Sequence, residues 1–255
     1  MIGARAPHDN LRFEELARRY NFRTNSDRRR VFARLLIKEC EQREKPVRVL
    51  DVGCGRGIGR IRAYQEALRP HVDEYWGIEP DTDVEPLAGL FDHFEHALME
   101  DADLPENHFD VVYSFMVMEH VADPDAFMQA VQRVLKPGGV YIFMTPNGGH
   151  YFTIFANTLH KMKLDEMMLR ILKPGMVEKY HYPVAYKFNK VRDIDATASR
   201  LGFEAPEYAF LEPDGPRDYM RGPLILLFHL LAWKRTVIKN PRCLLDLTCR
   251  MTKKS

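Results

Sequence analysis

The sequence contains few cysteines, no long apolar run and almost no net charge. Its 255 residues include four cysteines, with no C-x-x-C pair and no histidine at zinc-finger spacing, so we expect free thiols and no structural zinc site. Lys plus Arg number 37 and Asp plus Glu 36, and a net charge of +1 gives no overall attraction to nucleic acid. The opening MIGARAPHDN lacks the regions of a secretory signal, and the longest uncharged apolar run, 223–233, has 11 residues where a bilayer span needs about 20. These absences predict a cytoplasmic protein.

The chain divides into segments of different character. Residues 1–46 predict two helices that form an N-terminal extension or lid. Residues 47–147 alternate short β-branched runs with amphipathic helices, and 188–215 add a further helix and strand. This alternation predicts an α/β fold with a Rossmann-like, doubly wound, mostly parallel sheet. Residues 148–187, rich in Met, His and aromatics, predict a cap inserted over the carboxyl edge of the sheet, where ligands bind in open α/β sheets.

Hydrophobic periodicity and turn residues give the expected elements of the core. We expect strands at 47–52, 74–78, 94–98, 109–115, 140–144 and 206–211. We expect helices at 58–68, 124–135 and 189–201.

The strongest local signal is the glycine-rich sequence VLDVGCGRGIG at 49–59. A strand that ends in closely spaced glycines and leads into a helix lets backbone N–H groups approach a ligand without obstruction by Cβ atoms. The dinucleotide fingerprint G-x-G-x-x-G needs a glycine at position 58 or 60, which hold Ile58 and Arg60. The pattern present is G-x-G-x-G, so a nicotinamide-binding protein of the same fold, or a non-catalytic one, is kept only as an alternative.

Together with later motifs, this loop resembles the class I S-adenosylmethionine-dependent methyltransferases. The matching stretches are WGIEP at 76–80, LPENHFDVVYSFMVMEHV at 104–121, LKPGGVYIFMTPN at 135–147, and His181 with LGF at 201–203. They follow one another in the family's order and cover more than half of the chain. The resemblance implies the class I methyltransferase fold and S-adenosyl-L-methionine as the cofactor that donates the methyl group.

The resemblance also implies roles for residues around these motifs. Asp51 would lie near the ammonium group of the donor or near the loop backbone that holds it, with capping of the following turn as the alternative. Glu79 would bind the ribose hydroxyls, and either Glu100 or Asp101 would lie near the adenine amino group. The full set of expected cofactor-binding residues is Asp51, Gly53, Cys54, Gly55, Gly57, Glu79, Pro80, Glu100, Asp101, Ser114 and Phe115.

A histidine after the fourth strand is the first candidate for a catalytic base. His120 would face the transferred methyl group and take the acceptor proton, or else hold its loop by a hydrogen bond. His150, Tyr151 and His181 are further candidates. In ubiquinone O-methyltransferases and small-RNA 2′-O-methyltransferases, a similar E-x-x-E-H motif carries a divalent metal. Here Met116 replaces the first acid, and a thioether is a poor ligand for a hard cation, so we expect no metal.

The residues after the fourth strand also bear on the acceptor. The family's N-methyltransferases that act on adenine or glutamine carry an Asn/Asp-Pro-Pro-aromatic motif there, whereas this chain has SFMV at 114–117. An oxygen acceptor, a hydroxyl or a carboxylate, is therefore favoured.

Residues 216–255 predict an apolar helix followed by a basic tail, with the last strand of the resembled family as the alternative for the apolar run. Residues 217–255 contain nine Lys or Arg and two acids. Basic flanks around an apolar helix suit a peripheral seat on the inner, anionic face of a membrane, and the alternative is a core or dimer helix with a solvated tail. The tail and TPNGGHY at 145–151 resemble methyltransferases of polysaccharide and glycolipid assembly. We therefore expect a lipid-linked glycan, sugar or other small-molecule acceptor, a quinone-like lipid included, in preference to nucleic acid. The oligomeric state is left open.

Overall fold

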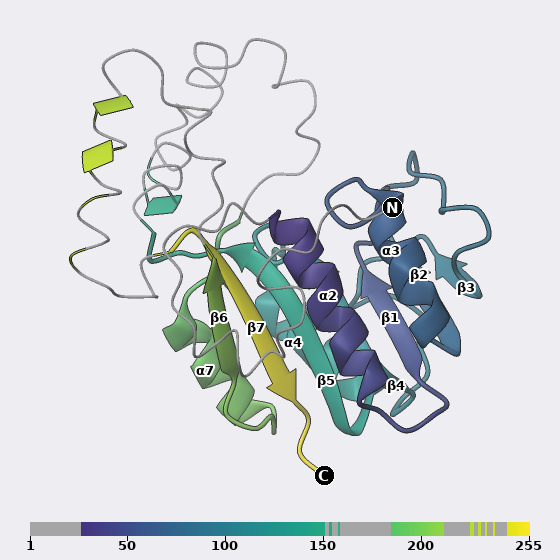
Figure 1. Ribbon diagram of the computed structural model, residues 1–255. Coiled ribbons are helices and arrows are strands. Elements are labelled where there is room, and N and C mark those ends of the chain that lie inside the picture. Colours follow the sequence, from purple (N-terminus) through teal and green to yellow (C-terminus); the bar gives the residue numbers. More distant parts are fainter. Residues whose placement is uncertain are drawn as a thin grey trace.

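The computed structural model describes residues 27–150, 185–211 and 244–255, with nine further positions between 153 and 237 (Figure 1). Its strands form one sheet in the order β3-β2-β1-β4-β5-β7-β6. The strands are β1 Arg48–Val52, β2 Glu74–Ile78, β3 His93–Glu95, β4 Phe109–Phe115, β5 Leu135–Pro146, β6 Glu207–Leu211 and β7 Asp246–Thr252. The helices are α2 Arg28–Glu41, α3 Arg62–Leu68, the 3-10 helix η1 Arg69–His71, α4 Pro124–Val134 and α7 Val191–Arg200.

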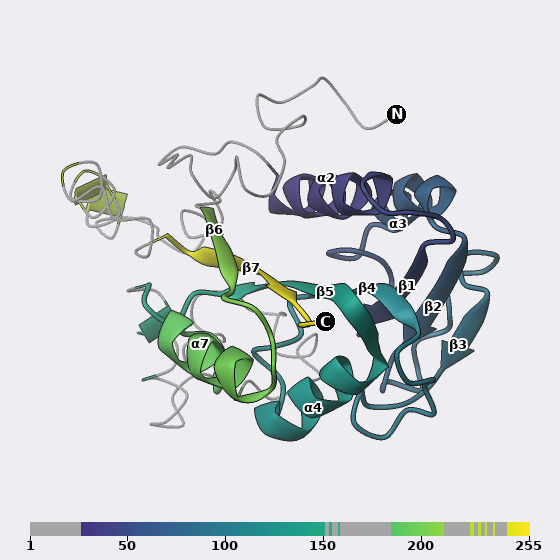
Figure 2. The same ribbon diagram turned by 90° about the horizontal axis from the view of Figure 1, so that it is seen from below.

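Helices cover both faces of this sheet, as the sequence predicts. Strands β1 to β5 run parallel, and β7 is antiparallel to both of its neighbours. Figure 2 shows α2 and α3 on one face and α4 and α7 on the other. Successive residues of a strand point to opposite faces, so Val49 packs in the α2–α3 core while Leu50 packs in the α4–α7 core. The doubly wound, mostly parallel architecture is confirmed.

Polar caps begin two of the helices. The carboxylate of Asp27 accepts a hydrogen bond from the Arg29 amide at 3.0 Å, so Asp27 is the cap of the second N-terminal helix, α2. The first expected helix lies outside the described residues. Asp123 caps α4 through the amides of Asp125 and Ala126, and Pro124 occupies its first turn.

Some expected bounds are wrong. The helix expected at 58–68 begins only at Arg62, because Ile58 and Ile61 pair in a bridge that closes the turn after the glycines. The strand expected at 94–98 ends at Glu95. The helix expected to run to Leu135 ends at Val134, and β5 begins at Leu135 and includes the Pro-Gly-Gly sequence that lies between the expected helix and the expected strand.

The largest correction concerns the end of the chain. We expected 188–215 to end the sheet and the following residues to form a helix and a tail. Instead Asp246–Thr252 is strand β7, which lies between β5 and β6 and pairs with both. Leu247, Cys249 and Met251 are fully buried there in the α4–α7 core. The predicted tail is therefore wrong for these residues. Most of the expected cap at 148–187 lies outside the described residues.

Candidate active site

The glycine loop follows β1 at the carboxyl edge of the sheet. The amides of Gly53 and Cys54 both donate to the carbonyl oxygen of Ile78, at 2.9 and 3.1 Å, and so tie the loop to the end of β2. Gly53, Gly55 and Gly57 have φ angles of +68°, +48° and +108°, a region that favours glycine. The loop is therefore held in a shape that other residues would strain.

The glycines differ in what a side chain would meet. A Cβ atom at Gly57 would lie 2.6 Å from the backbone nitrogen of Arg62, and one at Gly53 would lie 2.6 Å from a methyl group of Val117. These two glycines are needed for packing within the protein. A Cβ at Gly55 would meet nothing closer than Glu79 Oε2 at 3.7 Å. Packing within the protein therefore leaves the space at Gly55 open, and this open position lies beside Glu79.

Glu79 lies at the end of β2 and faces this loop. Its Oε2 atom accepts a hydrogen bond from the Gly55 amide at 2.9 Å, and its Oε1 accepts one from the Asp81 amide at 3.1 Å. Only 6% of the residue is exposed, and Pro80 beside it is half-buried. The structure thus brings together the acid and the glycine that the sequence assigned to one site.

Asp51 belongs to a buried side-chain network. Its Oδ2 atom accepts hydrogen bonds from the Tyr113 hydroxyl at 2.6 Å and from the Gln65 amide, and the Tyr113 hydroxyl also contacts that of Tyr75. These partners are side chains and not the backbone of the following turn, so Asp51 does not cap that turn. Burial raises the pKa of Asp51 to about 7, although Tyr113 and Gln65 work to lower it. Sequence reasoning missed Gln65 and Tyr113.

Three other expected cofactor residues are largely buried. Ser114 is fully buried, and its hydroxyl lies 2.7 Å from that of Tyr141 in the α4–α7 core. Phe115 is half-buried on the other face, where its ring lies 5.2 Å from that of Phe32. Cys54 is a free thiol whose pKa burial raises. The side chain of Ser114 thus points into the core and not to the loop.

Glu100 and Asp101 lie in the loop after β3. The Asp101 amide donates to the carbonyl oxygen of Leu98 at 3.1 Å, which closes a turn. Glu100 is half-buried and Asp101 is exposed. The assignment of one of them to the adenine amino group stays a prediction.

Glu119 and His120 follow β4 at the same edge of the sheet as the glycine loop. The His120 amide donates to Val117 at 2.8 Å, and the residue is partly exposed. Glu119 is buried, and its Oε2 accepts a hydrogen bond from the Thr145 hydroxyl at 3.1 Å. Burial raises the pKa of Glu119 to about 7, against smaller opposing effects of hydrogen bonds with its own backbone amide and with Thr145. Glu119 was missed from the sequence, although a carboxyl group beside the candidate base was visible there.

The remaining candidate bases are less accessible or lie elsewhere. His150 is fully buried, and its amide donates to the Asn147 carbonyl oxygen at 3.0 Å. Tyr151 and His181 lie outside the described residues. Within the described part of the chain, no group of three His, Cys, Asp or Glu is placed to hold a metal ion. Metal independence stays a prediction.

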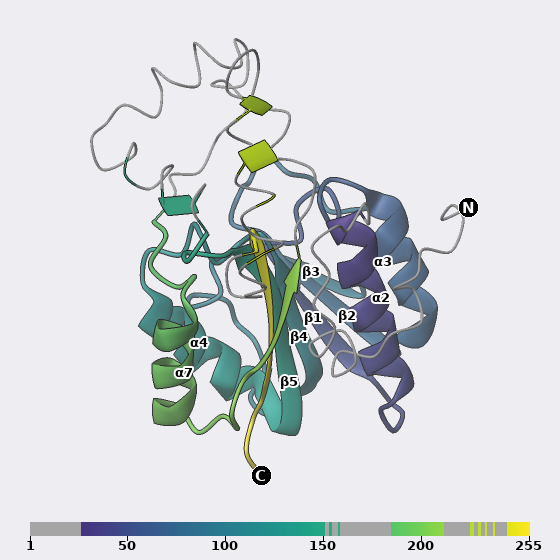
Figure 3. The same ribbon diagram turned by 60° about the vertical axis from the view of Figure 1, so that its left-hand side comes forward.

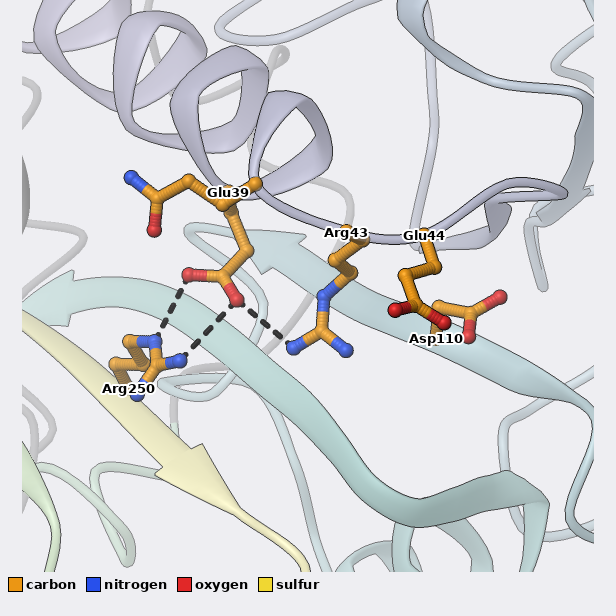
Figure 4. Close-up of a pocket in the computed structure, with 6 residues that line it drawn as sticks. Glu39, Arg43, Glu44, Asp110 and Arg250 are labelled. Atoms are coloured by element: carbon orange, nitrogen blue, oxygen red, sulfur yellow. Dashed lines mark hydrogen bonds and ion pairs between the residues drawn. The ribbon is translucent and has the colours of Figure 1, made fainter.

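A polar cavity of about 400 Å³ lies at the opposite edge of the sheet, away from the glycine loop (Figure 4). It is lined by Glu39, Gln42, Arg43, Glu44, Asp110 and Arg250. Glu39 accepts hydrogen bonds from Arg43 at 2.8 Å and from Arg250 at 2.9 and 3.1 Å. Burial works to raise the pKa of Glu39, but the two guanidinium groups outweigh it and hold that pKa below its ordinary value. The pair between Glu39 and Arg250 joins α2 to β7, a structural role.

Comparison with known proteins identifies the family. Residues 24–204 match the model of a methyltransferase domain family, well over half of the chain. A ubiquinone biosynthesis O-methyltransferase from Bordetella bronchiseptica is 30% identical over 193 residues, which are 72% of this chain and 70% of that protein. The chain belongs to the class I S-adenosylmethionine-dependent methyltransferases.

Further relatives agree with this methyltransferase assignment. A probable S-adenosylmethionine-dependent methyltransferase from Mycolicibacterium smegmatis is 32% identical over 131 residues, which are 47% of this chain and 44% of that protein. The structure of YcgJ from Bacillus subtilis has a TM-score of 0.55 at 16% identity and covers 88% of this chain and 98% of that one. A methyltransferase from Archaeoglobus fulgidus has a TM-score of 0.53 at 16% identity, with 88% and 94% covered. These structures confirm the fold of the methyltransferase. S-adenosylmethionine is the methyl donor of its family.

Among the described residues, no helix of this methyltransferase is long and apolar enough to cross a membrane.

Proposed function

We propose that this methyltransferase transfers a methyl group from S-adenosylmethionine to an oxygen atom of a small-molecule acceptor. The observation that carries the proposal is the space beside Gly55, bordered by Glu79 at the end of β2. Backbone amides and a carboxylate at the carboxyl edge of a parallel sheet are suited to a ligand with hydroxyl and ammonium groups. Gly55, Glu79 and Asp51 are the residues that would hold it.

Residues after β4 would remove the proton from the acceptor. When bound, S-adenosylmethionine supplies an electrophilic methyl carbon on a sulfonium. An imidazole nitrogen of His120 would take the hydroxyl proton as the acceptor oxygen attacks. The buried Glu119 fixes the turn that carries His120, because Thr145 holds its carboxyl group and its carbonyl oxygen accepts hydrogen bonds from the amides of Ala185 and Tyr186.

Two observations support a small-molecule acceptor that is methylated on oxygen. Relatives about 30% identical are named ubiquinone biosynthesis O-methyltransferases, which favours transfer to oxygen. The TPNGGHY motif at 145–151 and the basic residues of the segment 217–242 favour a sugar or glycolipid hydroxyl. We therefore place sugars and glycolipids first and quinone-like phenols second.

Cofactor binding is tested by calorimetry with S-adenosylhomocysteine. We expect binding to the wild-type chain and its loss in Gly55→Val, because the side chain would fill the space beside the loop. Gly89→Val is the matched control: its φ of +69° also strains a side chain, but nothing lies within 4 Å of its Cβ position, so it should bind as the wild type does. Binding of NAD⁺ in place of S-adenosylhomocysteine would overturn the assignment.

The transfer itself is tested with radiolabelled methyl donor and panels of sugars, glycolipids and quinone-like phenols. Release of labelled methanol in mild base separates methyl esters from methyl ethers, and hence carboxylate from hydroxyl acceptors. His120→Ala should lower kcat and leave S-adenosylhomocysteine affinity unchanged. Unchanged kcat in this variant would remove His120 as the base.

A further inference from the structure

Four large apolar side chains lie exposed along the segment that joins β6 to β7. Leu226 and Leu230 are 71% and 57% exposed, and Trp233 and Val237 are each 64% exposed. Each of these positions is helical. Their spacings of four, three and four residues are those of side chains that share one face of a helix. We call Leu226, Leu230, Trp233 and Val237 the apolar stripe.

The apolar stripe belongs to the edge of the sheet that carries the candidate active site. β6 ends at Leu211, β7 begins at Asp246, and these two residues are register partners. The joining segment therefore leaves and re-enters the sheet at its carboxyl edge, where the glycine loop and His120 also lie. Figures 1 and 3 show described helical positions of this segment beyond that edge. Ile154, 53% exposed, follows β5 at the same edge.

Positive charge accompanies the apolar stripe in the sequence. Lys234 and Arg235 directly follow Trp233. The basic residues between positions 217 and 242 are Arg217, Arg221, Lys234, Arg235, Lys239 and Arg242. The same range contains a single acid, Asp218, so it carries a net charge of +5 in a chain whose total is +1. An exposed apolar face within a basic segment is complementary to a surface whose outer layer is anionic and whose interior is apolar.

We infer that the apolar stripe docks on the surface of an anionic phospholipid bilayer. Leucine and tryptophan side chains on one helical face enter the boundary between headgroups and acyl chains, and a basic segment is attracted to lipid phosphates. Tryptophan is enriched at this depth because its ring is amphipathic. The inference does not depend on which acceptor is methylated.

The test is sedimentation of the full chain with vesicles. Vesicles of equal parts phosphatidylcholine and phosphatidylglycerol should bind the wild type, and vesicles of phosphatidylcholine alone should bind it much more weakly. The double variant Leu230→Glu, Trp233→Glu should bind the anionic vesicles roughly tenfold more weakly or worse. Leu98→Glu is the matched control, because it places the same charge on an apolar residue, 48% exposed, in the loop after β3. It should bind as the wild type does.

A fluorescence measurement follows the stripe directly. The chain has two tryptophans, so Trp76→Phe leaves Trp233 as the single reporter. Its emission should shift to the blue with anionic vesicles, and high salt should reverse the shift. Leu226→Ser, Val237→Ser provides a milder test if the glutamate variant fails to fold.

Three results would overturn the inference. One is a wild type that binds neither kind of vesicle. Another is a folded stripe variant that still binds as the wild type does. The third is a lipid-free wild type that is dimeric while the stripe variant is monomeric, because a second copy of the chain would then cover this face.

Discussion

The free energy of unfolding of the ligand-free methyltransferase should decrease as the pH rises from about 5 to about 8. Asp51 and Glu119 are both buried, and burial raises the pKa of each to about 7, from ordinary values of 3.8 and 4.5. A carboxyl group with a raised pKa binds its proton more tightly in the folded protein. Its contribution to stability is therefore largest at low pH and is lost as the pH rises through about 7.

The expected size of the effect follows from these pKa values. For one carboxyl group with a folded pKa of about 7, going from pH 5 to pH 8 removes roughly 2–3 kcal/mol of stability. Asp51 contacts Tyr113 and Gln65, and Glu119 contacts Thr145, so the two groups have separate partners. Their effects should add, to a decrease of roughly 5 kcal/mol.

Urea denaturation across this pH range measures the effect. Asp51→Asn replaces the carboxyl group by a neutral group of the same size and should remove about half of the decrease. Glu119→Gln is the matched variant and should remove the other half. Tyr113→Phe removes a hydrogen bond that lowers the pKa of Asp51, so it should move the transition to higher pH. If Asp51→Asn kept the full decrease, or if wild-type stability rose with pH, the reasoning would be refuted.

Two further predictions concern the glycine loop and the ion pairs. Gly57→Ala should cost about 2–4 kcal/mol, because its Cβ would meet the backbone of the next helix at 2.6 Å, whereas Gly89→Ala, with open space around it, should cost about 1 kcal/mol. Thermal or urea unfolding compares the two. Glu39→Gln should cost about 3 kcal/mol in the same assay, because it removes a buried carboxylate and leaves two half-buried guanidinium groups without it. Glu41→Gln, which breaks an exposed pair with Lys38, should cost less than about 0.5 kcal/mol.

The sheet could be predicted where its strands are buried on both faces. β2 and β4 have the expected bounds, and β1 differs by one residue, because buried parallel strands are short apolar runs that glycine or charged residues interrupt. The site elements that depend on these strands were predicted with them. Glu79 and Gly55 meet because each follows the carboxyl end of a neighbouring strand.

Partners on different elements could not be read from local patterns. Asp51 and Tyr113 are register partners on β1 and β4, 62 positions apart, so their contact appears only when the strand order is known. In the sequence Tyr113 is simply one more aromatic residue of a buried strand. Gln65 is a polar residue in a short helix, and no sequence pattern around it indicates that it contacts Asp51. The environment that raises the pKa of Asp51 is therefore a property of the fold.

The basic residues in and directly after β7 were predicted wrongly for the same reason, and Lys253, which follows the strand, tests the correction. The residue is 9% exposed, and its ammonium group donates to the Asn107 side chain at 2.7 Å and to the carbonyl oxygens of Gln132 and Leu135, each at 2.8 Å, at the end of α4. Lys253→Ala should cost about 3 kcal/mol of unfolding free energy, because three acceptors lose a charged donor. Lys254→Ala, one residue further and exposed, should cost less than about 0.5 kcal/mol. If both variants lost the same small amount of unfolding free energy, the two lysines would belong to a solvated tail. A clear difference between the variants is expected only if the Lys253 side chain is anchored in the fold and that of Lys254 is not.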